Sequence, residues 1–219
     1  MTIPKLYYFP VYGKAEPIRM ILALAKIPFE DVHLNYEEWA KIKLEKPEMF
    51  EFNQLPVFER DGKFYSQSTA ITKMLAIENG FYPTKTEDIY DVESMLEGFT
   101  DWANSLLAVR RQIPGAPPFD EDTKANITTE FMKTANPLFL KVLEARLKKN
   151  GGGEFYVGDK VTIADIAMCH CYTGLFNGKL FGPLLGDSLD AFPAVKVYFE
   201  GLAEGVFKDY LKGRPAYDM

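Results

Sequence analysis

Apolar and polar positions along the first part of the chain alternate between strand-like runs and helical spacing. The aromatic run at residues 5–9 is closed by Pro10, which cannot donate a hydrogen bond to a sheet, and it predicts a first strand. Apolar residues recur every three or four positions across 15–26, which predicts an amphipathic helix. A second strand is expected at 29–34. The polar segment 36–46 fits either a weak helix or an ordered loop.

A hairpin and another helix follow. Two strand-like runs, 57–60 and 63–65, are joined by Asp61-Gly62, a dipeptide typical of tight turns. Helical spacing resumes across 66–78 and ends at Asn79-Gly80, which suits a left-handed helix stop. This order of elements predicts a small mixed sheet with helices packed on it.

The rest of the chain has helical spacing and no strand pattern. Segments 87–112 and 123–149 predict two long helices, the second kinked at Pro137. The segment that joins the two halves lacks periodicity, and we place a domain boundary there. We therefore expect two domains, at 1–82 and 83–219.

A capping box marks the start of a later helix. The Thr162 oxygen can accept the N–H of Asp165, while the Asp165 carboxylate reaches back to the N–H of Thr162. The helix at 163–173 is rich in Ala, Ile, Met and Cys and is expected at the buried centre of the helical half. We interpret its cap as structural. Shorter helices are expected near 195–202 and 206–211.

Composition narrows the class of protein. Hydrophobic residues make up 47% of the 219 residues and charged residues 26%, which indicates a globular chain with enough apolar surface for a core. The formal net charge of −6 disfavours nucleic acid as a partner, because phosphates would meet net repulsion. No apolar stretch approaches the roughly 18 residues that span a bilayer, and the N-terminus lacks a signal-peptide pattern. We expect a cytoplasmic protein that does not insert into membranes.

The number and spacing of the cysteines and histidines disfavour both a metal site and a disulfide. Two cysteines occur, Cys169 and Cys171, and their i, i+2 spacing on a helix points the side chains to different faces. With His33 and His170 they form no recognisable metal-ligand spacing, and we interpret both histidines as ordinary strand and core residues. Glycine-rich phosphate loops and G-x-S-x-G elbows are absent. We predict no metal and a reducing compartment.

Four segments, taken in order, resemble one known family. They are 7–19 (YYFPVYGKAEPIR), 52–57 (FNQLPV), 66–71 (SQSTAI) and 157–165 (VGDKVTIAD). Together they are similar to the motifs of cytosolic glutathione transferases of the tyrosine type, and most like the pi and sigma classes. The resemblance implies a thioredoxin-like N-terminal domain that binds glutathione, an all-helical C-terminal domain that supplies an electrophile pocket, and a homodimer.

The resemblance assigns the role of thiolate stabiliser to Tyr8. At the end of the first strand, its hydroxyl can donate a hydrogen bond to the glutathione sulfur and favour the ionised form. Lowering a thiol pKa by two units requires about 2.7 kcal/mol, within reach of a charge-assisted hydrogen bond helped by other dipoles. Spacing alone would make Tyr8 a half-buried strand tyrosine. Tyr7 should face the opposite side of the strand and belong to the core.

Other glutathione contacts are implied at three places. Gln54-Leu55-Pro56, with Pro56 in the cis form, resembles the segment whose backbone pairs with the cysteinyl part of glutathione. Gln67-Ser68 opens a helix whose N–H groups and positive dipole end suit the γ-glutamyl carboxylate. Trp39 and Lys43 lie four apart on one helical face and would hold the glycyl carboxylate. A serine acting only as a helix cap, and a solvated Lys43, are the simpler alternatives.

Two further residues are implied in contacts between subunits. Asp101 matches the family position that reaches across the dimer toward the γ-glutamyl ammonium. Phe52 resembles the aromatic key that inserts into the partner subunit in several classes. We expect Phe9, Val11 and Tyr12 to form the wall of the electrophile pocket.

Two positions bear on how the site works. Lys14 stands where these classes usually carry arginine near the catalytic tyrosine, and it keeps the charge but loses the planar fork. Thiolate activation could therefore be weaker or differently wired, although Lys14 is still expected in the glutathione site. Arg111 falls at a pocket position and would make the electrophile site less apolar.

We therefore expect a dimeric glutathione transferase that adds the glutathione thiolate to hydrophobic electrophiles, with no covalently modified protein residue. A glutathione-dependent isomerase of the prostaglandin D synthase type is one alternative. A non-catalytic ligandin or crystallin-like relative is another. The joint presence of the implied binding set speaks against a purely structural descendant; its members are Tyr8, Gln54, Gln67, Ser68 and Asp101.

Overall fold

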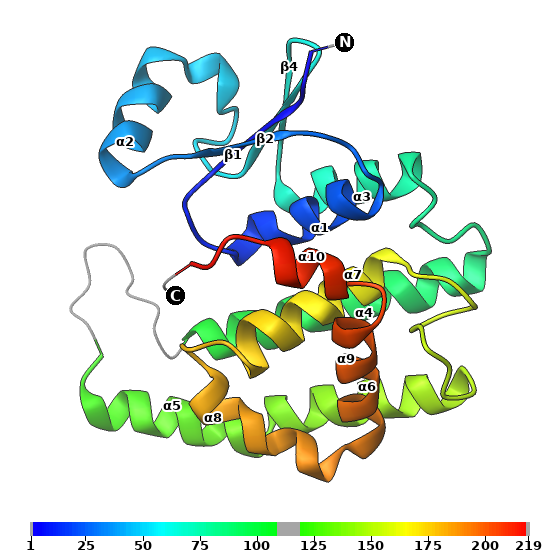
Figure 1. Ribbon diagram of the computed structural model, residues 1–219. Helices are drawn as coiled ribbons and strands as arrows, with labels where there is room; N and C mark the ends of the chain where they lie inside the picture. The colour runs from blue at the N-terminus through cyan, green and yellow to red at the C-terminus, as the bar shows by residue number, and fades with distance from the viewer. Residues whose placement is uncertain (1, 109–118, 218–219) are drawn as a thin grey trace.

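The computed structural model describes residues 2–108 and 119–217. Its N-terminal half contains a four-stranded sheet in the order β2-β1-β3-β4 (Figure 1). The strands are β1 (Lys5–Tyr8), β2 (Glu30–His33), β3 (Val57–Arg60) and β4 (Lys63–Ser66). β2 runs parallel to β1, whereas β3 pairs antiparallel with both β1 and β4. The predicted small mixed sheet is confirmed, and with its helices it forms the thioredoxin-like βαβαββα arrangement.

Helices cover both faces of this sheet. α1 (Glu16–Leu24) and α3 (Ser68–Glu78) lie on the face next to the helical half, and α2 (Tyr36–Glu45) lies on the other (Figure 1). Because neighbouring strand residues point to opposite faces, Tyr8 joins the core shared with α1, whereas Tyr7 joins the smaller core beneath α2. The predicted division between these two tyrosines is confirmed.

The segment after β2 is a helix, which the apolar pattern alone left undecided. Asn35 Oδ1 accepts the N–H groups of Glu37 and Glu38, both at 2.9 Å, and the Glu38 carboxylate accepts the N–H of Asn35 at 2.8 Å. This capping box supplies partners for the first turn of a helix that has little apolar face to bury. The pattern Asn-x-x-Glu was present in the sequence and favours the helix.

The hairpin between β3 and β4 turns at Asp61-Gly62. Both residues have positive φ, 51° and 74°, as a two-residue type I′ turn requires. The predicted hairpin is confirmed, and β4 extends one residue further than expected.

The C-terminal half contains helices and no strand among its described residues. Its helices are α4 (Thr86–Ala108), α5 (Glu121–Lys133), α6 (Ala135–Lys149), α7 (Ile163–Cys171), α8 (Gly182–Leu185), α9 (Pro193–Glu204) and α10 (Lys208–Gly213). α7 packs against α1, α4 and α9 and is buried over nearly its whole length. The predicted central helix is confirmed, with its last residues continuing as a π-helical turn at Tyr172–Phe176.

The prediction of one kinked helix at 123–149 is wrong. Two helices, α5 and α6, meet at Thr134, whose hydroxyl donates to the Glu130 carbonyl at 2.7 Å. Pro137 is the third residue of α6. In the first turn of a helix the backbone N–H has no intrahelical partner to lose, so a proline there is tolerated without a kink.

Four residues on the predicted apolar helix faces are exposed: Ile77, Leu107, Leu138 and Val142. In α4 the buried positions are Val92, Met95, Trp102 and Leu106. Helical spacing therefore identifies which side of a helix is apolar but does not show where burial stops. The end of this helix predicted at residue 112 lies outside the described residues.

A short linker joins the two halves between α3 and α4. The Phe81 carbonyl accepts the N–H of Ile163 at 2.8 Å, and the Tyr82 hydroxyl donates to Glu93 at 2.7 Å. These bonds tie the linker to α7 and α4. The boundary predicted after residue 82 falls in this linker and stays a prediction.

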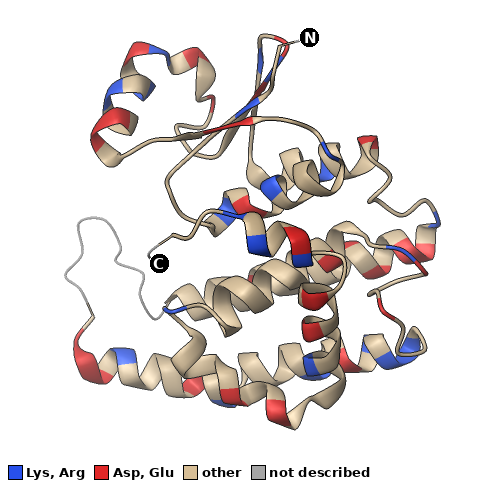
Figure 2. Cartoon of the chain, in the orientation of Figure 1, with Lys and Arg blue, Asp and Glu red and all other residues tan. Residues whose placement is uncertain are grey.

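Charged residues of both signs are interspersed along α2 and α5 (Figure 2). Across the described ranges, we find no helix that combines the length and the apolar character needed to cross a membrane.

Candidate functional site

Tyr8 lies at the end of β1 with only 9% of its surface exposed. Its hydroxyl oxygen accepts the backbone N–H of Lys14 at 3.2 Å. That N–H reaches Tyr8 because residues 13–15 form a short 3-10 turn directly before α1. Within the described residues the hydroxyl proton is not donated to another group. Tyr8 therefore offers a fixed oxygen and a proton that a bound molecule can accept.

Gly13 allows the chain to approach Tyr8 this closely. Its φ is +40°, and a Cβ built on it would meet the Tyr8 hydroxyl oxygen at 2.8 Å. A side chain here would be both strained and in collision, so the position requires glycine. Gly13 is not among the residues predicted for the site. The signal was a glycine in the turn between a strand and a helix.

The environment of Tyr8 keeps its hydroxyl protonated. Burial raises the pKa of Tyr8 above its usual value, while the Lys14 N–H and the positive charge of Arg19 act in the opposite direction. The net direction is upward, so at neutral pH the group is a phenol that can donate a hydrogen bond.

Arg19 on α1 anchors the loop that follows Tyr8. It is 3% exposed and forms a two-pronged pair with Asp31, with Nε–Oδ2 at 2.7 Å and Nη2–Oδ1 at 3.3 Å. Its Nη1 donates to the carbonyls of Val11 at 2.9 Å and Tyr12 at 3.3 Å. The guanidinium also lies 5.9 Å from the centre of the Tyr8 ring. Sequence reasoning did not single out Arg19, although an arginine beside the apolar positions of a helix was a usable signal.

Two glutamines expected in the glutathione site, Gln54 and Gln67, lie together in the structure. The Leu55–Pro56 bond is cis, as the resemblance implies. Gln67 Nε2 donates to Gln54 Oε1 at 3.4 Å, and both side chains are exposed. Segments 13 residues apart in sequence therefore place two amide side chains at one edge of the sheet.

The start of α3 has no side-chain cap. Gln67 is the N-cap residue, with φ 68°, and its side chain makes no capping hydrogen bond. The simpler alternative, in which Ser66 or Ser68 caps this helix, is therefore wrong. No side chain caps the first N–H groups of α3 beside Gln67, and the positive end of a helix dipole with uncapped N–H groups suits an anion.

Trp39 and Lys43 lie on one face of α2, as predicted. Lys43 Nζ is 5.5 Å from the centre of the Trp39 ring. The Trp39 ring packs edge-on against Phe50 at 4.8 Å and against the core beneath α2. This packing fixes the indole while the ammonium stays near it.

Of the expected pocket residues, Phe9 and Val11 follow Tyr8 directly and are half-buried. The Phe9 ring lies 5.9 Å from that of Tyr8 and 4.8 Å from that of Tyr36, which is 79% exposed. Tyr12 is covered by the C-terminal end of the chain, since its hydroxyl donates to the Pro215 carbonyl at 3.1 Å. Arg111, which is predicted to line the pocket, lies outside the described residues.

Asp101 and Phe52 stay predictions because their implied roles involve a second subunit. Asp101 is exposed on α4, and Phe52 is 53% exposed on the segment before β3. The side chain of Phe52 is thus available for a contact outside its own chain.

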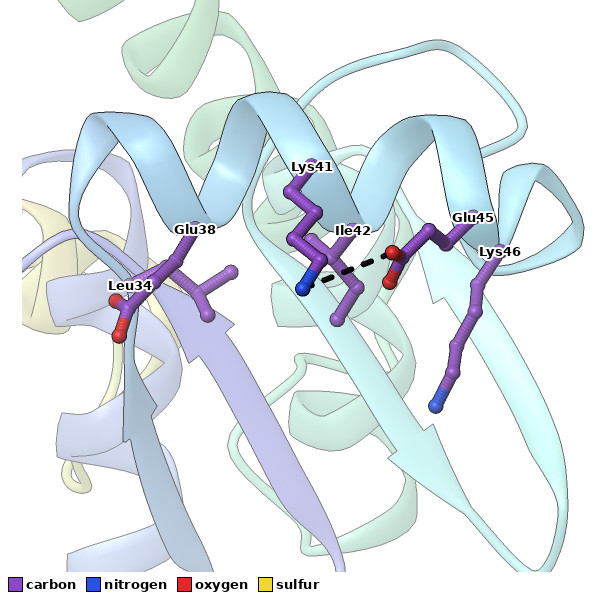
Figure 3. Close-up of a pocket in the computed structure, with 6 residues that line it drawn as sticks. All are labelled: Leu34, Glu38, Lys41, Ile42, Glu45 and Lys46. Atoms are coloured by element: carbon purple, nitrogen blue, oxygen red, sulfur yellow. Dashed lines mark ion pairs between the residues drawn. The ribbon is translucent and has the colours of Figure 1, made fainter.

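A pocket of about 290 Å³ lies beside α2 but contains none of the expected site residues. It is open and lined by Leu34, Glu38, Lys41, Ile42, Glu45 and Lys46 (Figure 3). Lys41 and Glu45, one helical turn apart on α2, form an ion pair at 3.8 Å at one side of the pocket (Figure 3). Trp39 and Lys43 alternate with these lining positions, so α2 turns them to another side.

The cysteines are not candidate nucleophiles. Cys169 and Cys171 are free and buried in α7. Burial raises the pKa of the Cys169 thiol to about 12 and that of Cys171 well above its usual value. Among the described residues, no group of three or more His, Cys, Asp or Glu could hold a metal ion.

Known proteins match this fold along the chain. The model of the glutathione S-transferase N-terminal domain matches residues 4–76, and that of the glutathione S-transferase C-terminal domain matches residues 114–214. Glutathione S-transferase 4 of Caenorhabditis elegans is 33% identical over 179 residues, which cover 80% of this chain and 82% of the relative. The chain belongs to the glutathione S-transferase family.

Some similar proteins are not named as glutathione S-transferases. S-crystallin 4 of Enteroctopus dofleini is 28% identical over 198 residues, covering 87% of this chain and 86% of the relative. The solved structure of prostaglandin synthase D of Nilaparvata lugens has a TM-score of 0.81 and 26% identity, and the match covers 99% of this chain and 100% of that one. The family resemblance is confirmed, while its members include more than one kind of protein.

Proposed function

We propose that this protein is a glutathione transferase that joins the glutathione sulfur to hydrophobic electrophiles. The observation that carries the proposal is Tyr8, a nearly buried phenol whose oxygen is fixed by the Lys14 N–H and whose proton remains available. A hydroxyl that accepts a hydrogen bond becomes a better donor of its own proton, because successive bonds polarise one another. Tyr8 can therefore stabilise a thiolate more strongly than an isolated tyrosine.

The reaction follows from this stabilisation. The glutathione thiol releases its proton to solvent, and Tyr8 donates a hydrogen bond to the resulting thiolate. The sulfur then forms a bond to the electrophilic carbon. In a substitution the leaving group departs with its electron pair, and in an addition the acceptor takes up a proton from solvent. Tyr8 keeps its own proton throughout.

The rest of the proposed site holds the peptide. Trp39 and Lys43 present an indole N–H and an ammonium to the glycyl carboxylate. The backbone of Leu55 pairs with the cysteinyl part, and the start of α3 at Gln67 and Ser68 receives the γ-glutamyl carboxylate. In this proposal, α2, the segment before β3 and the start of α3 each hold a different part of the glutathione peptide.

Five more positions complete the proposal. Lys14 adds positive charge beside the thiolate, Asp101 of a second subunit meets the γ-glutamyl ammonium, and Phe9 and Val11 face the electrophile. Tyr12 contributes its ring rather than its hydroxyl, which is already bonded to the end of the chain.

The test compares two neighbouring tyrosines. Tyr8→Phe should lower the turnover of an aryl halide with glutathione by about a hundredfold, the equivalent of two pKa units of thiolate stabilisation. Tyr7→Phe is the matched control: it removes the same group one residue away, on the other face of the sheet, where the Tyr7 hydroxyl donates to Glu59 at 2.7 Å. Equal activity of Tyr8→Phe and wild type would remove Tyr8 from its role.

A glutathione-dependent isomerase is the second candidate, favoured by the full-length similarity to prostaglandin synthase D. An isomerase returns glutathione unchanged, whereas a transferase consumes one glutathione for each product. Incubation with a prostaglandin endoperoxide and, separately, with an aryl halide would distinguish them through the glutathione remaining. A non-catalytic crystallin-like protein would turn over neither substrate.

We also propose that the protein is a homodimer located in the cytoplasm. Phe52, half-exposed on its loop, would insert into the partner subunit. Phe52→Ser should shift the sedimentation profile toward the monomer, while Val197→Ser, which removes an exposed apolar side chain from α9, should not. An unaltered sedimentation profile for Phe52→Ser would contradict the proposal that Phe52 inserts into the partner subunit.

A further inference from the structure

The C-terminal strap, residues 214–217, crosses the loop between β1 and α1. After α10 the chain returns to the N-terminal half, and its last described residues lie beside the start of α1 (Figure 1). Arg214 Nη1 bonds to Glu16 Oε1 at 2.6 Å, and both side chains are largely or fully buried. The Arg214 guanidinium lies 4.1 Å from the centre of the Tyr12 ring. The last described residues of the chain are therefore packed against its first turn.

Further contacts join the strap to the same loop and to β2. The Tyr12 hydroxyl donates to the Pro215 carbonyl at 3.1 Å, and the rings of Tyr12 and Tyr217 meet edge to face at 4.9 Å. The Tyr217 hydroxyl lies 2.9 Å from His33 Nε2. Three of the four strap residues thus contact the N-terminal half.

The loop held by the strap is the one that carries the hydrogen bond to Tyr8. The Tyr12 carbonyl accepts the N–H of Glu16 at 3.0 Å, which closes the turn at residues 13–15. The Lys14 N–H in that turn is the donor to Tyr8. Arg214 contacts residues at both ends of the turn, through the Tyr12 ring and the Glu16 carboxylate.

Charge balance explains why an arginine is needed here. Glu16 is fully buried and lies between two cations, with Oε2 3.4 Å from Arg19 and Oε1 2.6 Å from Arg214. Removing one partner of a buried ion pair leaves an uncompensated charge. An arginine can bond the carboxylate and lie over the Tyr12 ring with the same planar group, which a lysine cannot do equally well.

We propose that Arg214 is a positioning residue for the reaction: it holds the turn between Tyr12 and Glu16 so that the Lys14 N–H meets the Tyr8 hydroxyl. Its consequence for catalysis rests on the proposed function of Tyr8. The simpler alternative is that the strap only links the two halves of the molecule. Another ion pair provides the comparison, since Lys73 on α3 bonds Glu93 on α4 at 2.5 Å and joins the same halves without contacting the turn.

The first measurement does not depend on activity. Amide exchange at Lys14, followed by NMR in the full-length protein, should be about tenfold faster in Arg214→Met than in wild type. Arg214→Lys should restore part of the protection, and Lys73→Met should leave it unchanged. Tyr12→Phe removes the bond to Pro215 without leaving a buried charge, and it should also speed the exchange. This variant keeps the test possible if Arg214→Met does not fold.

The second measurement addresses the chemistry. Arg214→Met should raise the pKa of the bound glutathione thiol by about one unit. It should lower kcat about tenfold while the KM for glutathione changes less than about twofold, since the residues that hold the peptide remain. Arg214→Lys should recover part of kcat.

The outcomes separate the two proposals. Unchanged Lys14 exchange in both Arg214→Met and Tyr12→Phe, or an equal effect of Lys73→Met, would overturn the positioning role. If wild type itself shows no glutathione thiolate, the proposed function of Tyr8 fails. In that case the exchange data alone still decide whether Arg214 holds the turn.

Discussion

Two polar clusters in this molecule differ in how fully their hydrogen bonds are satisfied. In the helical half, the Asp165 carboxylate is buried and accepts bonds from the backbone of Tyr156 and Thr162, both at 2.7 Å, and from the Tyr198 hydroxyl at 2.7 Å. In the N-terminal half, Gln54 and Gln67 are exposed and share one contact at 3.4 Å. The first cluster is complete within the chain, whereas the second has capacity left for a ligand.

This difference separates structural polar residues from binding residues better than residue type does. Burial raises the pKa of Asp165, although its hydrogen bonds act to lower it. A buried carboxylate of this kind is tolerated because each lone pair finds a donor. Tyr8 is intermediate between the clusters: its oxygen is satisfied inside the chain and its proton is not.

Asp165→Ala should lower the free energy of unfolding by about 3–5 kcal/mol, since it leaves several buried donors without an acceptor and removes the helix cap. Chemical denaturation is the measurement. The control is Asp159→Ala, which removes an exposed acid from the loop before α7 and should change stability by less than about 0.5 kcal/mol. A similar small effect for both would mean that the buried cluster does not stabilise the fold.

Gly13→Ala should lower turnover about tenfold, because the added Cβ would meet the Tyr8 hydroxyl oxygen at 2.8 Å and displace it. Gly158→Ala is matched to it, since Gly158 also has positive φ (+66°) but nothing lies within 4 Å of its Cβ position. Both variants should lose about 1–2 kcal/mol of stability from backbone strain. Steady-state kinetics should show a loss specific to Gly13→Ala, and an equal loss in both would contradict the close approach to Tyr8.

Gln67→Glu should weaken glutathione binding about tenfold, or 1.4 kcal/mol, because it places a negative charge where a carboxylate is expected. Stability should change by less than about 0.5 kcal/mol, since the side chain is exposed. Calorimetric titration with glutathione is the measurement. Thr129→Glu adds the same charge at an exposed position of α5 and should leave affinity unchanged. Equal affinities for Gln67→Glu and wild type would place the carboxylate elsewhere.

The elements that depend on neighbours in sequence could be predicted. The Asp61-Gly62 hairpin and the Thr162–Asp165 box each rest on a few adjacent residues, and both are confirmed. The division of Tyr7 and Tyr8 follows from the strand period alone. Pro137 shows the limit, because its effect depends on where the helix begins.

The parts of the site that could not be predicted are contacts between distant segments. Glu16 and Arg214 are 198 positions apart, and no local pattern joins them. Gly13 is visible in the sequence as a glycine. Its close approach to Tyr8, which leaves no room for a Cβ, depends on the turn that brings the two residues together. The proposed binding residues come from the family resemblance, since an exposed glutamine has no distinctive spacing.

Stabilisation of the glutathione thiolate by Tyr8 can be measured by ultraviolet difference titration of the protein with glutathione near neutral pH. We predict a saturable thiolate signal in wild type and in Tyr7→Phe, with the bound thiol pKa about two units higher in Tyr8→Phe. A thiolate signal of the same size and pH dependence in Tyr8→Phe would contradict the account.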